Sequence, residues 1–246
     1  MRVALLQIRL SPESVARNVQ AIVGAIDRAA NTDPAPDLLV LPGALDTGGS
    51  VCTTDHTAAV LDGTRSAIVA KAREWGVFIA AGLGVIRDGD LHSSAVLLDP
   101  DGDVLMNIGD CESDDPGAGG ECPDLFSTSV GDIGLSDLNG TAMPGGLVRA
   151  SDRGALMIAS RRADCADGRR CLGGGDVRTT MCDLALRSGM HWCVVSPSSS
   201  RGAGIAEGGA GSFVCGPSGK LLTVVDPSKE TIVQVDIAIV PAGLSE

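Results

Sequence analysis

The sequence has almost no aromatic side chains and very little lysine. Phe, Trp and Tyr together make up 2% of the 246 residues, and tyrosine is absent. Hydrophobic residues still account for 44% of the chain, so the core must be built mainly from alanine, valine, leucine and isoleucine. Lysine occurs only at Lys71, Lys220 and Lys229, which leaves a long central stretch without an ammonium side chain.

Positive charge as a whole is in deficit. Nineteen Lys and Arg face 31 Asp and Glu, which gives a net charge of −12 and a pI near 4.6. Such a surface argues against binding to a nucleic-acid backbone or to an anionic membrane, because both require clustered Lys and Arg. The chain also lacks a basic segment followed by an apolar one at its start, and no apolar run approaches the roughly 20 residues that cross a bilayer. We therefore expect a cytoplasmic protein that binds neither nucleic acid nor membrane.

Motifs for cofactors and metals are also missing. Gly82-Leu83-Gly84 lacks the third glycine of a dinucleotide loop, and the three glycines at 173–175 lack the Lys-Ser/Thr of a phosphate loop. No cofactor is therefore predicted. Cys165, Cys171 and Cys182 are spaced too widely for zinc ligands, so no metal is predicted, although a relocated cysteine nucleophile stays an alternative. The histidines do not accompany the strained serine turn that a Ser-His triad would need; they are His56, His92 and His191.

Strand-like and helix-like segments alternate along the chain. Apolar residues recur at helical spacing within 14–30, and the Asp-Pro-Asp-Gly at 99–102 is a turn signal between two apolar runs. The pattern predicts a layered α/β fold in a single domain spanning 1–246. Helices are predicted at 14–30, 63–75, 145–153 and 177–189, with polar loops at 107–127 and 161–176. Strands are predicted at 2–8, 37–41, 77–85, 93–98, 103–106, 130–135, 155–159, 192–196, 211–215, 220–225 and 231–237.

Residues 133–145 read IGLSDLNGTAMPG. This stretch resembles the nucleophile segment of the nitrilase, or carbon–nitrogen hydrolase, superfamily, whose usual form is close to IGxxICYDxRFPE. The opening Ile-Gly and the proline, here Pro144, match without a gap. In this register the nucleophilic cysteine falls on Leu138, the acidic residue two positions later on Gly140, and the glutamate after the proline on Gly145.

Other segments are similar to the same superfamily across most of the chain. MRVALLQI at the start is like its first strand, which typically ends in Gln, and Asn18 fits its N-x-x-x-I pattern. DLLVLPGALDTGG at 37–49 is like its second strand and loop, and places the catalytic glutamate on Gly43. Its Tyr-Arg-Lys falls on 108–110, so the lysine position is Asp110. Near the C-terminus, the helix-end Arg and Glu fall on Arg187 and Gly189, and the following hairpin is in register at Ser212, Pro217 and Gly219.

The resemblance implies a four-layer αββα sandwich of the nitrilase type. It also implies a site where cysteine attacks, one glutamate is the general base, lysine stabilises the charged intermediate, and a second glutamate supports them. Here these four positions are Leu138, Gly43, Asp110 and Gly145. None has the group that its own position requires: Leu138 has no nucleophile, Gly43 and Gly145 have no carboxylate, and Asp110 carries a negative charge in place of the cation. We therefore predict a pseudoenzyme with little or no hydrolysis of non-peptide C–N bonds, whose positions 43, 110 and 138 converge near the sheet ends.

A chain that keeps the scaffold without the site could act through assembly. The resemblance implies pairing through helices, so a homo-oligomer of two or more copies is expected, with an active homologous partner as a further option. The expected surfaces follow Pro144 and surround 177–189, with Ala150, Ala155, Leu184 and Leu186 as candidates for burial there or in the core. Two alternatives stay open. One is a hydrolase with a non-standard site, although using Ser136 or Asp137 would break the ungapped match. The other is a small-molecule binding module that uses a pocket emptied by glycines.

Overall fold

The computed structural model describes residues 1–11, 13–46, 58–87, 90–109, 125–137, 155–160, 177–198 and 211–239. Three of the four predicted site positions lie outside these ranges, namely Asp110, Leu138 and Gly145. So do Gly140, Ala150, the helix predicted at 145–153 and the loop predicted at 161–176. Gly43, the fourth site position, is described.

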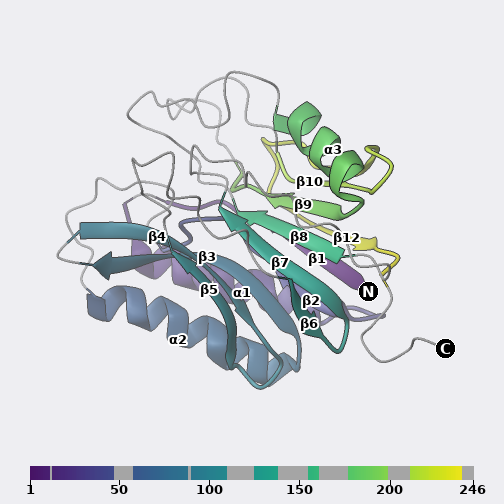
Figure 1. Ribbon diagram of the computed structural model, residues 1–246. Helices are drawn as coiled ribbons and strands as arrows, with labels where there is room; N and C mark the ends of the chain where they lie inside the picture. The colour runs from purple at the N-terminus through teal and green to yellow at the C-terminus, as the bar shows by residue number, and fades with distance from the viewer. Residues whose placement is uncertain are drawn as a thin grey trace.

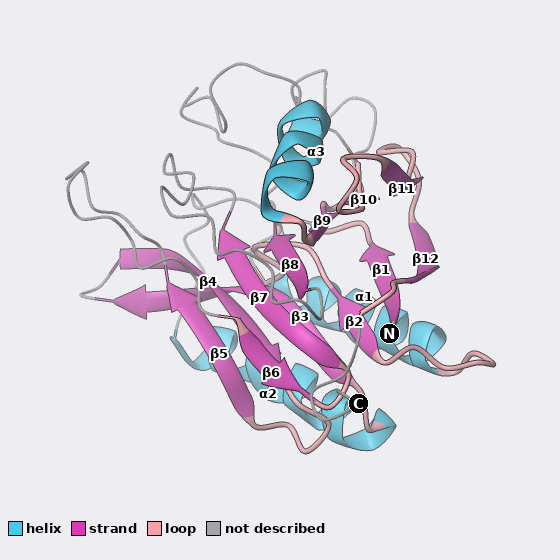
Figure 2. Ribbon diagram, turned by 45° about the vertical axis from the view of Figure 1, so that its right-hand side comes forward, coloured by secondary structure: helices cyan, strands magenta, loops and turns pink. Residues whose placement is uncertain are grey.

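Twelve strands of the described chain form two sheets of six. The first sheet has the order β12-β1-β2-β3-β4-β5, and the second has the order β11-β10-β9-β8-β7-β6 (Figures 1 and 2). In each sheet three neighbouring strands are parallel, β1-β2-β3 in the first and β7-β8-β9 in the second, and the remaining pairs are antiparallel. The first sheet comprises β1 (Arg2–Gln7), β2 (Leu38–Val40), β3 (Phe78–Arg87), β4 (Asp90–Leu98), β5 (Val104–Gly109) and β12 (Thr231–Asp236). The second comprises β6 (Phe126–Thr128), β7 (Gly131–Asp137), β8 (Ala155–Ser160), β9 (His191–Val195), β10 (Phe213–Cys215) and β11 (Leu221–Val224).

Side chains alternate along the strands between two buried layers. On β1, Ala4 and Leu6 pack with helices α1 (Val15–Ala30) and α2 (Ala58–Trp75), whereas Val3 and Leu5 face the other sheet. On β9, Cys193 joins the layer between the sheets, and Trp192 packs against α3 (Val177–Ser188). The order of layers is therefore helix, sheet, sheet, helix, with α1 and α2 on one outer face and α3 on the other (Figure 1). The predicted αββα sandwich is confirmed.

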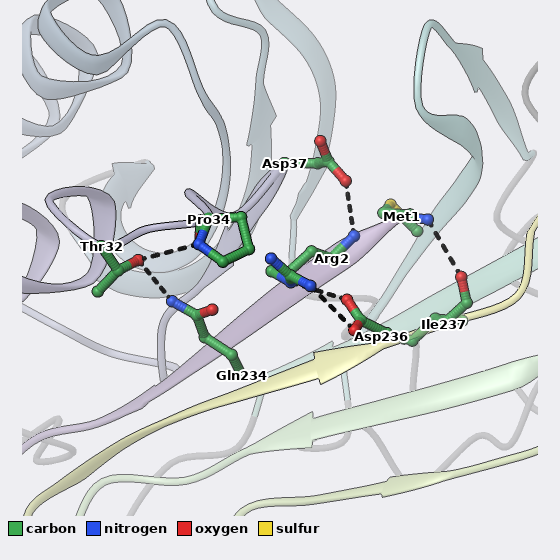
Figure 3. Close-up of polar contacts among 8 residues, drawn as sticks. All are labelled: Met1, Arg2, Thr32, Pro34, Asp37, Gln234, Asp236 and Ile237. Carbon is green, nitrogen blue, oxygen red and sulfur yellow. Dashed lines mark hydrogen bonds and ion pairs between the residues drawn. The ribbon is translucent and has the colours of Figure 1, made fainter.

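Polar contacts fasten the last strand to the first (Figure 3). The Arg2 guanidinium donates to both carboxylate oxygens of Asp236, with Nε–Oδ1 and Nη2–Oδ2 distances of 2.8 and 3.0 Å. The backbone N–H of Arg2 donates to Asp37 Oδ2 at 2.6 Å. Farther along β12, Gln234 Nε2 donates to Thr32 Oγ1 at 2.7 Å. The Arg2–Asp236 pair and the antiparallel backbone ladder hold β12 beside β1, although the two strands lie at opposite ends of the sequence. The other two bonds tie β1 to the start of β2 and β12 to the segment after α1.

The structure corrects two of the predicted elements. Helix α2 begins at Ala58 rather than at 63. Leu61 in the added turn is buried, and this packing outweighs the low helix propensity of Gly63. The loop predicted at 107–127 is shorter, since β5 continues to Gly109 and β6 begins at Phe126. Strand β6 is only three residues long and its Phe126 is exposed, so it exists through pairing with β7 and gives no apolar alternation in the sequence.

Candidate functional site

Gly43 lies buried in the segment that follows β2, and this segment is held on β3 by backbone bonds. Leu41 N–H donates to Ala80 O at 2.9 Å, and Leu45 N–H donates to Gly82 O at 3.0 Å. Between them, Gly82 N–H donates to the carbonyl of Pro42 at 3.2 Å. The backbone on both sides of Gly43 is therefore fixed, and the position that resembles the catalytic base is an ordered one that carries no side chain.

Asp46 anchors the far end of this segment and was not identified from the sequence. Its carboxylate is completely buried and accepts from Gly84 N–H at 3.0 and 2.9 Å, while its backbone carbonyl accepts from Asn18 Nδ2 at 3.1 Å. Asn18 also bonds the backbone of Ser11 in both directions. The carboxylate nearest to Gly43 in sequence is thus engaged in holding the loop. Of the residues in this clamp, the sequence analysis had singled out only Asn18, through its fit to the N-x-x-x-I pattern.

The carboxyl ends of β7, β8 and β9 lie side by side. Asp137 pairs with Ser160, and Ser160 pairs with Val195, in parallel register. Leu138, at the position that resembles the nucleophile, directly follows β7. Ligands of parallel sheets bind outside the carboxyl ends of the strands. Any chemistry is therefore expected at this end of the strands, which we call the candidate edge.

A backbone bond between the sheets shows that Gly43 belongs to the same edge. Ser198 N–H, just after β9, donates at 2.8 Å to the carbonyl of Ile8, just after β1. Strands β1 and β2 are parallel, and so are β7, β8 and β9. The carboxyl ends of both parallel triplets therefore lie at one end of the sandwich, which brings the segment of Gly43 and the end of β7 to the same side. The predicted convergence of residue 138 itself lies outside the described residues.

Gln7 joins the two sheets close to this edge. Its Oε1 accepts from the N–H and the hydroxyl of Ser212 at 2.8 and 2.9 Å. Its Nε2 donates to the carbonyls of Asp226 and Lys229, both at 2.7 Å. Gln7 is fully buried, and all four of its hydrogen-bonding positions are used. The Gln and Ser that resemble superfamily residues are therefore structural contacts of the scaffold.

Two other positions of the resemblance have structural roles or surface locations. Gly189, at the position of a glutamate, ends α3 with φ of +69°, and its N–H donates to Ala185 O at 3.0 Å. A positive φ at the residue after a helix favours glycine. Arg187 is exposed and pairs with Asp183 at 3.4 Å on the same helix.

Among the residues that the structure describes, two buried side-chain polar atoms have no hydrogen-bond partner, His191 Nδ1 and Ser198 Oγ. His191 begins β9, so it lies at the opposite end of that strand from the candidate site. Burial lowers the pKa of the His191 imidazole, which keeps the ring neutral. Ser198 follows β9 at the candidate edge, and its hydroxyl is the polar group there that sequence reasoning missed.

A hollow of about 270 Å³ lies between α2 and strands β3, β4 and β5. Its lining includes Arg65, Leu83, Val96 and Asn107. Leu83 and Val96 belong to the layer under the helices, so the hollow is on the outer face of the first sheet. Gly84 also lines it, and the N–H of Gly84 donates to Asp46, so the hollow borders the segment that holds Gly43. Within the described ranges, no group of three or more His, Cys, Asp and Glu could hold a metal ion, and no helix is long and apolar enough to cross a membrane.

Comparisons with known proteins agree with this architecture. A family model described as carbon–nitrogen hydrolase matches residues 2–242. A structure of the amidase NitN from Nesterenkonia sp. AN1 superposes with a TM-score of 0.76 at 22% identity, covering 96% of this chain and 92% of that one. Another structure of an amidase from Nesterenkonia sp. gives a TM-score of 0.74 at 21% identity, covering 97% and 90%. A third, of the AN1 enzyme with a glutamate-to-glutamine change and acrylamide added at its active-site cysteine, gives 0.74 at 22%, covering 96% and 93%. A comparison with curated proteins finds no match.

The match over nearly the whole chain shows the family: this chain belongs to the carbon–nitrogen hydrolases. The structural similarity shows the nitrilase-type fold.

Proposed function

We propose that this carbon–nitrogen hydrolase family member is catalytically inactive and acts as a structural or regulatory subunit of an oligomer. The observation that supports the first half is Gly43. It is buried just after the carboxyl end of β2, where the resemblance places the general base, and it has no carboxylate. The sequence register adds Leu138 for the nucleophile and Asp110 for the cation. Covalent catalysis fails without a nucleophile beside a base, and Asp110 would repel the negative charge of the intermediate.

The related amidase gives a concrete point of contrast. Structures of that enzyme are described with acrylamide and with the acetamide moiety of fluoroacetamide attached to its active-site cysteine. A leucine at the corresponding position has no atom that could form either bond. The proposal therefore also predicts that residue 138 stays unmodified by these reagents.

An activity assay tests the inactivity directly. Purified protein is incubated with simple amides, nitriles and N-carbamoyl compounds, and released ammonia is measured beside the Nesterenkonia amidase as a positive control. We expect no turnover above the blank and no effect of thiol-blocking reagents. Turnover that disappears when one cysteine is changed would overturn the proposal and establish a hydrolase with a relocated nucleophile.

The second half of the proposal is supported by exposed apolar side chains on the outer side of the second sheet. Leu186 of α3 is 59% exposed, and Leu221, Leu222 and Val224 of β11 are 42%, 48% and 43% exposed. The hairpin and the helix touch, since a Cβ on Gly219 would lie 3.2 Å from Leu186 Cβ. Strand β11 is also an edge of the described sheet. Apolar patches and open strand edges are typical of association surfaces.

Of the residues that the sequence suggested for this surface, one is buried within the chain and one is exposed. Leu184 is buried within the chain, where it packs in the layer of Trp192 and α3. Leu186 points outward and stays a candidate. Ala155 begins β8 and belongs to the second sheet. The assembly surface that we propose therefore consists of Leu186 and the exposed side of β11.

Sedimentation velocity at micromolar concentration tests the assembly. The wild-type chain is expected to sediment as a dimer or larger. Leu186→Glu should lower the mass while circular dichroism stays unchanged. Val60→Glu is the matched control, because Val60 is an exposed apolar residue on α2 in the opposite layer. A monomeric wild type with no partner recovered from native extract contradicts assembly.

A second candidate function is a binding pocket at the emptied edge, favoured by the buried Ser198 hydroxyl without a partner. A monomer whose melting temperature rises with small amides or carboxylates, and less so in Ser198→Ala, would support this reading.

A further inference from the structure

Two cysteines that are 33 residues apart in sequence meet between α3 and β10. The Sγ atoms of Cys182 and Cys215 are 3.2 Å apart, within the range of an S–H···S contact in which either thiol can donate. Cys182 is half-buried on the helix, and Cys215 is buried at the end of the strand. Nothing in the sequence pairs them, because one lies in a polar helix and the other in an apolar run.

Their surroundings favour a bond between these two sulfurs over other pairings. Cys215 lies on the face of the second sheet that packs against α3, together with Trp192. The third described cysteine, Cys193, is on the neighbouring strand but faces the layer between the sheets. The sheet therefore separates Cys193 from the pair. A disulfide has an S–S length of about 2.05 Å, so the two sulfurs need to approach by only about 1.1 Å.

We propose that Cys182 and Cys215 are a reversible redox site, which a hydroperoxide-class oxidant converts to a disulfide that ties α3 to β10. Cys182 reacts first because it is the less buried of the two residues. Its sulfur attacks the peroxide, the O–O bond breaks, and a sulfenic acid and water (or an alcohol) form. The sulfur of Cys215 then attacks the sulfenic sulfur. The S–S bond forms, the S–O bond breaks, and the hydroxide leaves as water with the Cys215 proton. Two electrons pass from the two thiols to the peroxide.

Burial decides the order of these steps. It raises the pKa of the Cys215 thiol, so this sulfur is a poor first nucleophile toward oxidant in solution. Once Cys182 carries a leaving group at contact distance, the second step is intramolecular, and the Cys215 proton has a nearby acceptor in the departing hydroxide. A dithiol reductant reverses the bond by exchange at the sulfur of Cys182, the less buried residue.

The chain allows a clean test by peptide mapping. Trypsin releases Cys182 in 179–187, Cys193 in 188–201 and Cys215 in 202–220, so each peptide carries one cysteine. Native protein is treated with a small excess of hydrogen peroxide, free thiols are blocked, and the digest is analysed by mass spectrometry with and without reductant. We expect a linked species of 179–187 and 202–220 that disappears on reduction. The melting temperature of the oxidised protein should rise by roughly 5–10 °C, because the bond closes a loop of more than thirty residues.

Matched variants decide between this site and incidental oxidation. Cys182→Ser should abolish both the linked peptides and the rise in melting temperature, whereas Cys193→Ser should keep both. If Cys215→Ser folds poorly, Cys182→Ser alone suffices, since its side chain is half-buried. Oxidation of Cys182 to sulfinic acid without cross-linking would overturn the proposal, as would linkage of either peptide mainly to 188–201, or no cross-link in protein that stays folded.

Discussion

Gln7 offers the sharpest test of how the two sheets are joined. Replacing it with leucine keeps a similar volume but removes four hydrogen bonds, two to Ser212 and one each to the carbonyls of Asp226 and Lys229. The Ser212 hydroxyl can turn to Ser196 O, which lies 3.3 Å away. The Ser212 N–H loses its acceptor, and the two carbonyls lose their Gln7 donor.

The size of the effect follows from how buried each bond is. A buried donor left without an acceptor costs about 1–3 kcal/mol, and each bond lost where water can enter costs about 0.5–1.5 kcal/mol. The expected loss for Gln7→Leu is therefore about 3–5 kcal/mol in the free energy of unfolding. For a chain of this length that corresponds to a fall of about 10 °C in melting temperature.

Gln234→Leu is the matched control. Gln234 is on the neighbouring strand, opposite Ala4 in the register, and makes one surface bond to Thr32. Its replacement should cost about 0.5 kcal/mol or less. Urea unfolding would be followed by circular dichroism and by the fluorescence of Trp75 in the first helical layer and Trp192 in the second sheet. A loss below about 1 kcal/mol for Gln7→Leu, or equal losses for both variants, would refute the reasoning.

Three further predictions address the titration of His191, the substitution of Gly43 and the hydrogen bonds of Asn18. Burial lowers the pKa of His191 below the ordinary histidine value of about 6.5, so near and below that pH the unfolded chain binds more protons than the folded one. The free energy of unfolding should therefore fall as the pH drops from 7 toward 5, and should fall less in His191→Leu. Urea unfolding at each pH measures both. Gly43→Glu should destabilise the chain by about 3–5 kcal/mol at neutral pH, since the added carboxylate is buried without a cation. Adding Asp110→Lys and Leu138→Cys should recover part of the stability but give only faint amidase activity. Asn18→Ala should lower the free energy of unfolding by about 2–4 kcal/mol, because three buried or half-buried hydrogen bonds to Ser11 and Asp46 are lost. Asn31→Ala, at the exposed end of α1, is the control and should leave the melting temperature nearly unchanged.

Much of the fold could be predicted because its signals are local. Helix α1 shows apolar residues at helical spacing, and Ser14 caps it by accepting from Arg17 N–H at 3.3 Å. The β4–β5 hairpin follows from Asp-Pro-Asp-Gly, where Gly102 has φ of +76° and the Asp99 side chain accepts from the N–H groups of Asp101 and Asp103. Strand β6 could not be predicted, because its only support is a partner strand.

The site could be predicted only as a set of positions. The resemblance identified Gly43, and parallel strand order explains why it shares an edge with the end of β7. Asp46 and Ser198 escaped because their importance depends on contacts that no local pattern encodes: a bond from Gly84 in one case, and burial without a partner in the other. The Cys182–Cys215 contact escaped for the same reason, since a helix and a strand bring the two sulfurs together.

The polar residues that this chain shares with the superfamily have hydrogen-bond partners within the scaffold, whereas a catalytic residue would have its partner in the active site. Gln7, Asn18 and Ser212 are buried, and each has hydrogen-bond partners on the chain's own backbone, so each stabilises the fold whether or not a reaction takes place. A catalytic carboxylate at position 43 would have a different partner, the cation of the active site. If Asp110 occupies the cation position, as we propose, that carboxylate would be buried beside a like charge, which is costly. Glycine removes the cost while leaving the backbone bonds around Gly43 intact. Under the proposed function, loss of the catalytic groups together, with the scaffold contacts kept, is the combination that physical chemistry favours for a chain that folds and associates without hydrolysing a substrate.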